Sequence, residues 1–297
     1  MNFSKPTLIS LLAFAALSCG VQAAELGEKG FVCGTKYTKG EEAVGRLRRE
    51  FAPTAEVFRR NGVPVEIAPI SVDVYVHVVS TPGIKPAKGP VVGIDSIDDT
   101  VVRNQVAVLN DSFKPANISF TFKETDKTSY DNWDFANFAT HELNLKKKLH
   151  KGSKTALNLY IIQYLGENKG GMCNAPWGLN QTDGLVLDGC FIDSRTVPGG
   201  PMATNNQGKI AVHEVGHWLG LLHTFQGGCD GDGDQVDDTP AHTSRFIGCT
   251  AEGLDTCPQP GIDPVHNYMA YNGDECSTEF TKGQIDRMHS MWQTYRL

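Results

Sequence analysis

Alternation of apolar and polar residues is clearest between Ser71 and Ser80, where valine occupies every second position from Val72 to Val78. A period of two places these side chains on one face, which is typical of a half-buried strand. Four further apolar runs predict strands, and two stretches of helical periodicity lie between them. The predicted strands are 118–122, 156–165, 184–187 and 191–197, and the predicted helices are 95–113 and 138–149.

This order of strands and helices predicts an α/β (α+β) fold with a mixed, twisted sheet. We expect 184–187 to be an edge strand that lines a cleft. A final helix is predicted over 281–295, because Ile285, Met288 and Trp292 fall on one helical face.

The segment 224–265 has a different character, since it is rich in Gly, Asp, Pro and Cys and shows little periodicity. Such a segment keeps its shape through disulfides or bound ions rather than through a core. Five aspartates crowd into nine positions, and calcium is the hard cation that accepts such oxygen ligands. We expect a calcium site there, with a solvated acidic loop as the alternative: Asp230, Asp232, Asp234, Asp237 and Asp238.

Composition places the chain among ordinary globular proteins, with 297 residues, 40% hydrophobic and 21% charged. The net charge is −7 and no basic stripe is present, so no nucleic-acid partner is expected. Lys5, an apolar run over 8–17 and the small residues before position 24 predict a secretory signal peptide over 1–23. The alternative is an N-terminal anchor, but the run is too short to span a bilayer.

The chemistry concentrates in the stretch from His213 to His223, which contains His-Glu-x-x-His followed by a third histidine. On a helix, His213 and His217 project from one face one turn apart, as two zinc ligands require. Gly220 allows the chain to leave the helix, so that His223 becomes the third ligand. Three protein ligands leave a fourth position for water, and Glu214 is placed to act as general base.

Seven cysteines follow the predicted signal peptide, which suits an oxidising compartment. Six of them surround and follow the histidine motif and predict three disulfides, but 15 pairings are open. These are Cys173, Cys190, Cys229, Cys249, Cys257 and Cys276. Three sequons, at Asn110, Asn117 and Asn180, are candidate glycosylation sites.

The charged segment 24–66 contains the arginine pairs 48–49 and 59–60, so we interpret it as a propeptide. The alternative is a solvated N-terminal helix of the mature enzyme. Cys33 lies within this segment as the unpaired cysteine. Its thiolate is a candidate zinc ligand that would displace the water and keep a precursor latent, and an incidental free cysteine is the alternative.

The motif from His213 to His223 resembles that of the metzincin zinc proteases. A second landmark, Asn267-Tyr268-Met269-Ala270-Tyr271, resembles the methionine turn of that clan. The resemblance implies that Met269 lies beneath the zinc ligands without binding the metal. It also implies that Tyr271 contacts the metal or stabilises the tetrahedral intermediate.

Within the clan, the chain is most similar to the pappalysin group and its small secreted fungal-type metalloproteases. The carrying features are Gly220-Leu221-Leu222-His223, Phe225-Gln226-Gly227-Gly228-Cys229, Asp238-Thr239-Pro240 and Cys33-Gly34-Thr35. This resemblance implies a catalytic domain over 67–297, with an upper subdomain 67–223, a lower subdomain 224–297 and a cleft between them. It also implies calcium in the aspartate-rich segment and the pairings Cys229–Cys257 and Cys249–Cys276, which leaves Cys173–Cys190.

We therefore predict a secreted, monomeric zinc metalloendopeptidase that acts on protein or peptide substrates. One alternative is a processing protease of narrow specificity, which would have the same active site. The chain shows no appended binding domain, which favours the broad-specificity degrader. The other alternative is a calcium-dependent binding protein with a relic zinc motif, which the intact Glu214 disfavours.

Overall fold

The computed structural model describes residues 32–35, 59–60, 63–64, 68–86, 89–90, 92–131, 133–243, 249 and 253–297. The predicted signal peptide 1–23 and most of the predicted propeptide 24–66 lie outside the described residues. No helix formed by the described residues is long and apolar enough to cross a bilayer.

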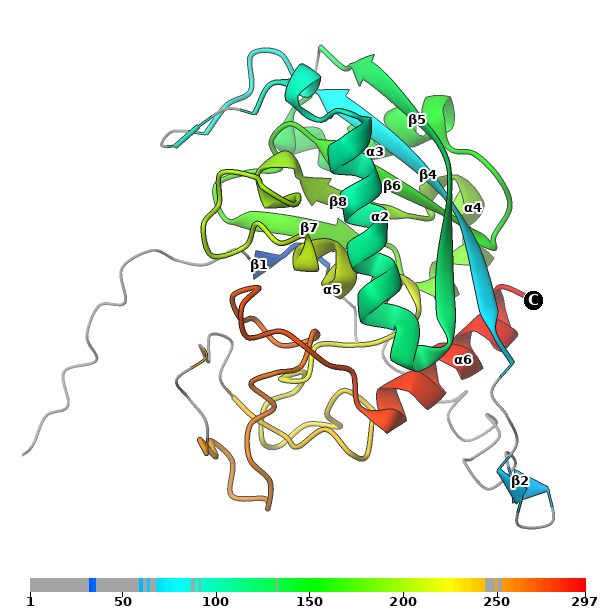
Figure 1. The fold of residues 1–297 in the computed structure, drawn as a ribbon, viewed down its shortest axis with the longest axis vertical. Helices are drawn as coiled ribbons and strands as arrows, with labels where there is room; N and C mark the ends of the chain where they lie inside the picture. Colours follow the sequence, from blue (N-terminus) through cyan, green and yellow to red (C-terminus); the bar gives the residue numbers. More distant parts are fainter. Residues whose placement is uncertain are drawn as a thin grey trace, which may run out of the picture.

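A mixed sheet forms the centre of the molecule, with the strand order β1-β7-β8-β6-β4-β5 (Figure 1). β4 pairs in parallel with β5 and β6, and β6 pairs in parallel with β8. β7 runs antiparallel to β8, and the short β1 lies parallel to the free edge of β7. The strands are β1 (Val32–Cys33), β4 (Ile70–Ser80), β5 (Ile118–Ser129), β6 (Ala156–Ile162), β7 (Lys169–Cys173) and β8 (Cys190–Asp193). Separately, β2 (Arg59–Arg60) pairs antiparallel with β3 (Val63–Pro64).

Helices cover both faces of this sheet, as the predicted α/β fold requires (Figure 1). The alternate valines of β4 are fully buried in the larger core together with residues of α2 and α5. The opposite face packs Val79, Tyr160 and Ile162 against Trp133 and Leu145. The helices are α2 (Asp99–Phe113), α3 (Phe138–Leu149), α4 (Gly184–Leu187), α5 (Lys209–Trp218) and α6 (Lys282–Tyr295). Single turns of 3-10 helix occur at η1 (Ile94–Ser96), η2 (Lys114–Ala116), η3 (Phe135–Asn137), η4 (Pro176–Asn180) and η5 (Ser194–Thr196).

The predicted edge strand 184–187 is wrong, because these residues form the short helix α4. Asp183 adopts a left-handed conformation with φ of 58°, which reverses the chain just before Gly184. A four-residue apolar run fits a strand and a buried helical turn equally well, so periodicity alone could not decide. The strand predicted over 191–197 is also shorter than expected. β8 ends at Asp193, whose carboxylate accepts a hydrogen bond from Arg195 N (2.9 Å) and starts η5.

The strand that borders the cleft is instead β7, which lies between β1 and β8 and was not predicted from the sequence. Its residues Lys-Gly-Gly-Met-Cys lack the β-branched side chains typical of strands. Gly171 is required there for another reason, since a Cβ at this position would lie 2.5 Å from Cγ of Glu214. The strand is therefore shaped by the cleft that it borders.

The described residues between α5 and α6 form turns and loops, with one isolated bridge between Asn267 and Glu279 (yellow to orange in Figure 1). Two disulfides cross this region, Cys229–Cys257 and Cys249–Cys276. A third, Cys173–Cys190, joins β7 to β8. These are the pairings that the resemblance implied.

Candidate active site

α5 brings two histidines of the motif together, and the turn after it adds the third. His217 Nε2 lies 3.2 Å from His213 Nε2 and 3.1 Å from His223 Nε2. All three side chains are buried. The three ring nitrogens therefore converge on one point, although His223 is six residues from its nearest partner in the sequence.

The turn that carries His223 into place is a helix C-cap with two backbone hydrogen bonds. Gly220 N donates to His217 O (2.9 Å), and Leu221 N donates to Gly216 O (3.0 Å). This is the Schellman arrangement, which needs a left-handed residue after the helix. Gly220 supplies it with φ of 95°, and a Cβ there would also collide with Met291.

For His213 and His217, a backbone carbonyl determines which ring nitrogen faces the point where the three rings converge. His213 Nδ1 lies 2.7 Å from Tyr268 O, and His217 Nδ1 lies 2.8 Å from Leu221 O. A carbonyl only accepts, so each Nδ1 carries the proton and each Nε2 presents a lone pair. Burial lowers the pKa of His213 to about 4 and lowers that of His217 well below its usual value, which favours the neutral rings.

This donor set fits a tetrahedral metal ion. Zinc–nitrogen distances of about 2.0–2.1 Å place the nitrogens of a tetrahedron roughly 3.3 Å apart, close to the spacing seen here. Three lone pairs at this distance repel one another unless a cation lies between them. Cys33 Sγ is the fourth member of the group, and all four candidate ligand atoms lie within 4.8 Å of one another.

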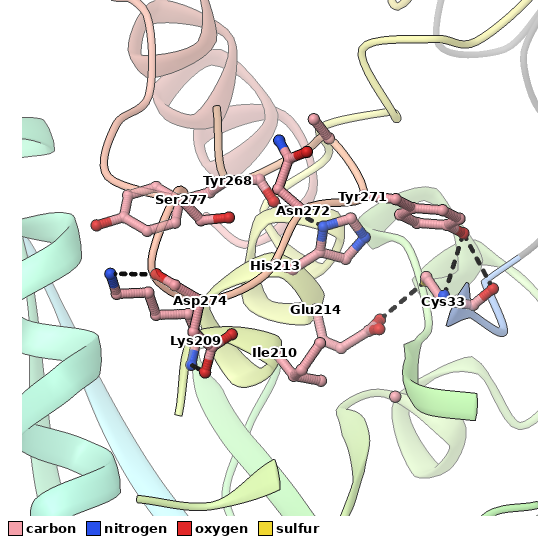
Figure 2. A pocket seen from close by; sticks show the side chains of 12 residues that line it. Cys33, Lys209, Ile210, His213, Glu214, Tyr268, Tyr271, Asn272, Asp274 and Ser277 are labelled. Carbon is pink, nitrogen blue, oxygen red and sulfur yellow. Dashed lines mark hydrogen bonds between the residues drawn. The ribbon is translucent and has the colours of Figure 1, made fainter. Parts of the chain in front are cut away.

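Glu214 lies beside this group with its side chain buried (Figure 2). Its Oε2 is 3.3 Å from Cys33 Sγ and 3.2 Å from Thr35 Oγ1. Burial raises the pKa of Glu214 to about 8, and the two hydrogen bonds oppose this shift in part. A carboxylate with a raised pKa is a better proton acceptor than an ordinary one.

The segment 32–35 occupies the cleft next to Glu214. β1 pairs with β7, and Gly34 N donates to Gly171 O (2.7 Å). Thr35 Oγ1 accepts a hydrogen bond from Cys173 N (2.9 Å). Desolvation, followed by the charge of Glu214, raises the pKa of the Cys33 thiol well above its usual value.

Tyr271, on the loops between α5 and α6, points its hydroxyl toward the same segment (Figure 2). Its hydroxyl accepts from Cys33 N (3.1 Å) and donates to Cys33 O (3.2 Å). Its ring lies edge-on to that of His223, with centroids 5.0 Å apart. The hydroxyl is therefore next to the metal-ligand group and engaged by the peptide that fills the cleft.

Met269 lies against the zinc-motif helix, between the two histidines that the helix carries. A Cβ at Gly216 would collide with the sulfur of Met269, which is fully buried. Met269 N donates a hydrogen bond to the side-chain oxygen Oδ1 of Asn267 (2.9 Å). The methionine turn therefore packs directly against α5, the helix that carries two of the histidines.

The five aspartates of the acidic segment do not form one cluster. Within the described residues, the only group of three or more His, Cys, Asp or Glu ligand atoms close enough for a metal is that of Cys33 and the three histidines. Asp234 is buried and accepts from Thr239 Oγ1 (2.7 Å). Asp238 instead faces the start of α6, where it accepts from Gly283 N (2.8 Å). Asp230, Asp232 and Asp237 are exposed.

The three sequons differ in accessibility. Asn117 and Asn180 are exposed. The amide of Asn110 instead bridges α2 to β5, since it donates to Val106 O (3.1 Å) and to Phe120 O (2.9 Å) and accepts from Phe120 N (2.8 Å). A glycan on that nitrogen is incompatible with these bonds, so the expectation of glycosylation narrows to Asn117 and Asn180.

Comparison with known proteins assigns the chain to a family. Residues 144–293 match the Peptidase M43 family model, described as pregnancy-associated plasma protein-A. An extracellular metalloprotease of Neurospora crassa is 42% identical over 288 residues, which cover 96% of each chain. The chain belongs to the pappalysin family of metalloproteases. Extracellular metalloprotease 1 of Coccidioides posadasii, 37% identical over 300 residues, covers all of this pappalysin and 99% of its own length.

Solved structures show the same fold for this pappalysin. A mutant of promirolysin from Tannerella forsythia aligns with a TM-score of 0.68 at 24% identity, covering 89% of this chain and 94% of its own. Mature mirolysin from the same organism, in complex with a cleaved peptide, aligns with a TM-score of 0.63 at 25% identity and covers 76% and 93%. The family implies a metal ion, typically zinc, and the histidine group fits it.

Two residues at the site of this pappalysin were missed by sequence reasoning. Thr35 was only part of a family-like tripeptide, and Gly171 was part of a glycine pair without a predicted role. Both contact Glu214 from segments far away in the chain. The only available sign was the position of Thr35 two residues after the unpaired cysteine.

Proposed function

We propose that this pappalysin is a secreted zinc endopeptidase that cleaves internal peptide bonds of extracellular proteins. The observation that carries the proposal is the convergence of three buried imidazole nitrogens next to one buried carboxylate. Secretion is supported by the predicted signal peptide and by relatives that are named extracellular metalloproteases. Cleavage of peptides is supported by mirolysin, which was solved with a cleaved peptide.

In this proposal His213, His217 and His223 hold the zinc ion. When bound, zinc polarises the scissile carbonyl and makes water a stronger acid. Glu214 accepts the proton of the attacking water and passes it to the leaving amine. Its burial serves this role, because it raises the pKa of Glu214 and so makes the carboxylate a stronger proton acceptor.

Tyr271 supplies a hydrogen-bond donor for the developing oxyanion. Its hydroxyl lies beside the ring of His223 and already donates to a peptide carbonyl, that of Cys33. A substrate carbonyl that replaces this one would receive the same donor at the point where negative charge develops.

The test of this function is cleavage of an unfolded protein by the processed enzyme with and without a zinc chelator. Activity is expected to disappear with chelator and to return with zinc. Glu214→Gln should retain zinc and lose on the order of 10²–10⁴ in turnover, because it removes the general base. Glu279→Gln, at an exposed carboxylate, is the matched control. Near-normal activity of Glu214→Gln would reject this assignment of the base.

The proposal includes synthesis as a latent precursor, with Cys33 as the fourth zinc ligand. Its thiol is within reach of all three histidines, and the segment around it also engages Glu214 and Tyr271. Promirolysin covers more of this chain than mature mirolysin does, which is what an N-terminal segment shared by the precursors would produce. Cys33→Ala should make the unprocessed chain active, whereas an incidental cysteine predicts no change.

Thr35 strengthens latency in this scheme, because its hydroxyl contacts the general base directly. Cys33→Ala and Thr35→Val should therefore activate the precursor additively, with Cys33→Ala contributing more. Thr35→Ser keeps the hydroxyl and serves as the control. If the Thr35→Val precursor were as latent as the wild-type precursor, Thr35 would have no part in this scheme.

We also propose a calcium ion at Asp234. Asp234 is the one buried residue among the five aspartates of the acidic segment, and a hard cation bound to its carboxylate would offset the cost of burying the charge. Calcium should raise the unfolding temperature of the wild-type chain and of Asp237→Asn but not that of Asp234→Asn. An equal shift in all three would favour the solvated acidic loop.

A further inference from the structure

α6 carries a side chain to the turn that places the third histidine. Arg287 is buried, and its Nε donates a hydrogen bond of 2.7 Å to the carbonyl of Gly220. Met291, one helical turn further along α6, packs against the same glycine. Gly220 lies between His217 and His223 in the sequence, so α6 touches the connection between two of the ligands.

Three carbonyls of this connection accept a hydrogen bond from a side chain. Trp218 O accepts from Arg296 Nη2 (3.0 Å), and Gly220 O accepts from Arg287. Leu221 O accepts from Nδ1 of His217 (2.8 Å). The peptide that follows Gly220 therefore sits between Arg287 and the carbonyl that orients a ligand. A shift of that peptide would displace the partner of His217 and the backbone leading to His223 together.

The same face of α6 also supports the methionine turn. Gln284, one turn before Arg287, exchanges two hydrogen bonds with the Asn267 side chain (2.8 and 3.0 Å). Asn267 Oδ1 in turn accepts from Met269 N (2.9 Å). Buried polar contacts thus connect α6 both to the turn at Gly220 and to the methionine turn.

We propose that Arg287 is a positioning residue of the metal site, which acts through the Gly220 carbonyl on His217 and His223. Groups that orient ligands in this way typically change metal affinity about 10- to 100-fold when they are removed. The inference rests on the three proposed histidine ligands, and its test is separate from theirs.

The experiment measures zinc affinity of the full chain by competition with a chromophoric chelator, together with the visible spectrum of the cobalt-substituted protein. R287M removes the donor and keeps an apolar chain of similar length. We expect R287M to bind zinc about 10- to 100-fold more weakly and to alter the cobalt bands. R287Q places an amide nitrogen where Nε was, so its affinity should return to within about threefold of the wild type, far inside the range expected for lost positioning.

H289M is the matched control on the same helix. His289 is buried and makes one hydrogen bond of 2.7 Å to the carbonyl of Ala116, which is far from the turn. Both methionine variants should lower the unfolding temperature, but only R287M should weaken zinc binding. Equal losses of affinity in R287M and H289M, or none in R287M, would overturn the proposal.

Two further variants separate the possible failures. If R287M does not fold, R287K replaces it, because its ammonium lies one bond beyond the position of Nε. R287K is expected to lose about tenfold in zinc affinity, the lower edge of that range, and wild-type affinity would again overturn the proposal. H223A tests the ligands themselves. Undiminished zinc binding by H223A would refute the proposed site, whatever Arg287 does.

Discussion

The sheet with α5 (here the upper part) and the loops between α5 and α6 (here the lower part) both contribute residues to the site but are stabilised in different ways. His213, Glu214 and His217 belong to α5, which packs into the large core of the sheet. His223, Met269 and Tyr271 lie on loops between α5 and α6, in a region crossed by two disulfides. Loops that are cross-linked by disulfides and hydrogen-bonded through their carbonyls therefore carry site residues as a packed helix does.

Removal of Cys229–Cys257 should have the largest effect on this balance. The bridge closes a span of 28 residues whose described part forms no helix or strand, so the double serine variant should lose about 2–5 kcal/mol of stability. The lower region should become sensitive to protease while α2 and the sheet remain folded. Limited proteolysis followed by mass spectrometry measures this.

Cys173–Cys190 provides the contrast. It joins residues that are already paired across β7 and β8, over a span of 17 residues. Its removal should leave the lower loops resistant to protease under the same conditions. Equal sensitivity of the two double variants would show that the lower region does not depend specifically on its own bridge.

Tyr271→Phe tests whether a loop residue contributes to catalysis as a helix residue does. Loss of one oxyanion donor should lower kcat by on the order of 10²–10³ with little change in KM. Steady-state kinetics of the processed enzyme measures both constants, and the unfolding temperature controls for stability. A tenfold or smaller loss of kcat would make Tyr271 a packing residue.

Gly216→Ala probes the contact between the two parts. Alanine favours a helix by up to about 1 kcal/mol over glycine, but the collision with Met269 should cost about 1–3 kcal/mol, so the variant should be less stable. Chemical denaturation measures the change. The double variant Gly216→Ala/Met269→Ala should lose less than the sum of the single changes, and strict additivity would contradict the contact.

Asp274 should produce the smallest effect, a dependence of stability on pH. This lower residue accepts hydrogen bonds from Gln207 N (2.7 Å) and Lys209 N (3.4 Å) at the start of α5, and it lines the pocket of Figure 2. Burial raises its pKa above the ordinary value of 3.8. The folded chain therefore keeps a proton that the unfolded chain releases, so stability should fall as pH rises from about 4 through the raised pKa.

Urea unfolding between pH 4 and pH 7 measures that slope. Asp274→Asn should remove the contribution, because the amide does not titrate, while Glu275→Gln at the exposed neighbour should keep it. A slope in Asp274→Asn equal to that of the wild type would exclude Asp274 as its source.

Strong periodicity made much of the upper part predictable from sequence. The valine alternation located β4, and the helix predicted over 138–149 has the bounds of α3. The histidine spacing predicted that the three rings converge, and His217 Nε2 lies within 3.2 Å of Nε2 of both other histidines. In these cases local pattern and tertiary packing favour the same structure.

Prediction failed where the environment, rather than the local pattern, determines the residue. β7 is a strand without strand-forming side chains, because its glycine makes room for Glu214. The contacts of Thr35 and Arg287 join segments separated by 179 and 67 residues, and no local period reports such pairs. The lower loops lack periodicity altogether, so only their cysteines and turn residues were informative.

The pairing of β1 along β7 affects how the sheet of this protein can associate with other polypeptide chains. An uncovered edge strand offers unpaired N–H and C=O groups to any extended peptide, and it is also a nucleus for unwanted strand association. Residues 32–35 cover that edge through the main chain, as in Gly34 N to Gly171 O. The segment that blocks the cleft therefore also protects the edge of β7 from association with other strands. A peptide that replaces this segment can form the same main-chain hydrogen bonds with β7, whatever its sequence.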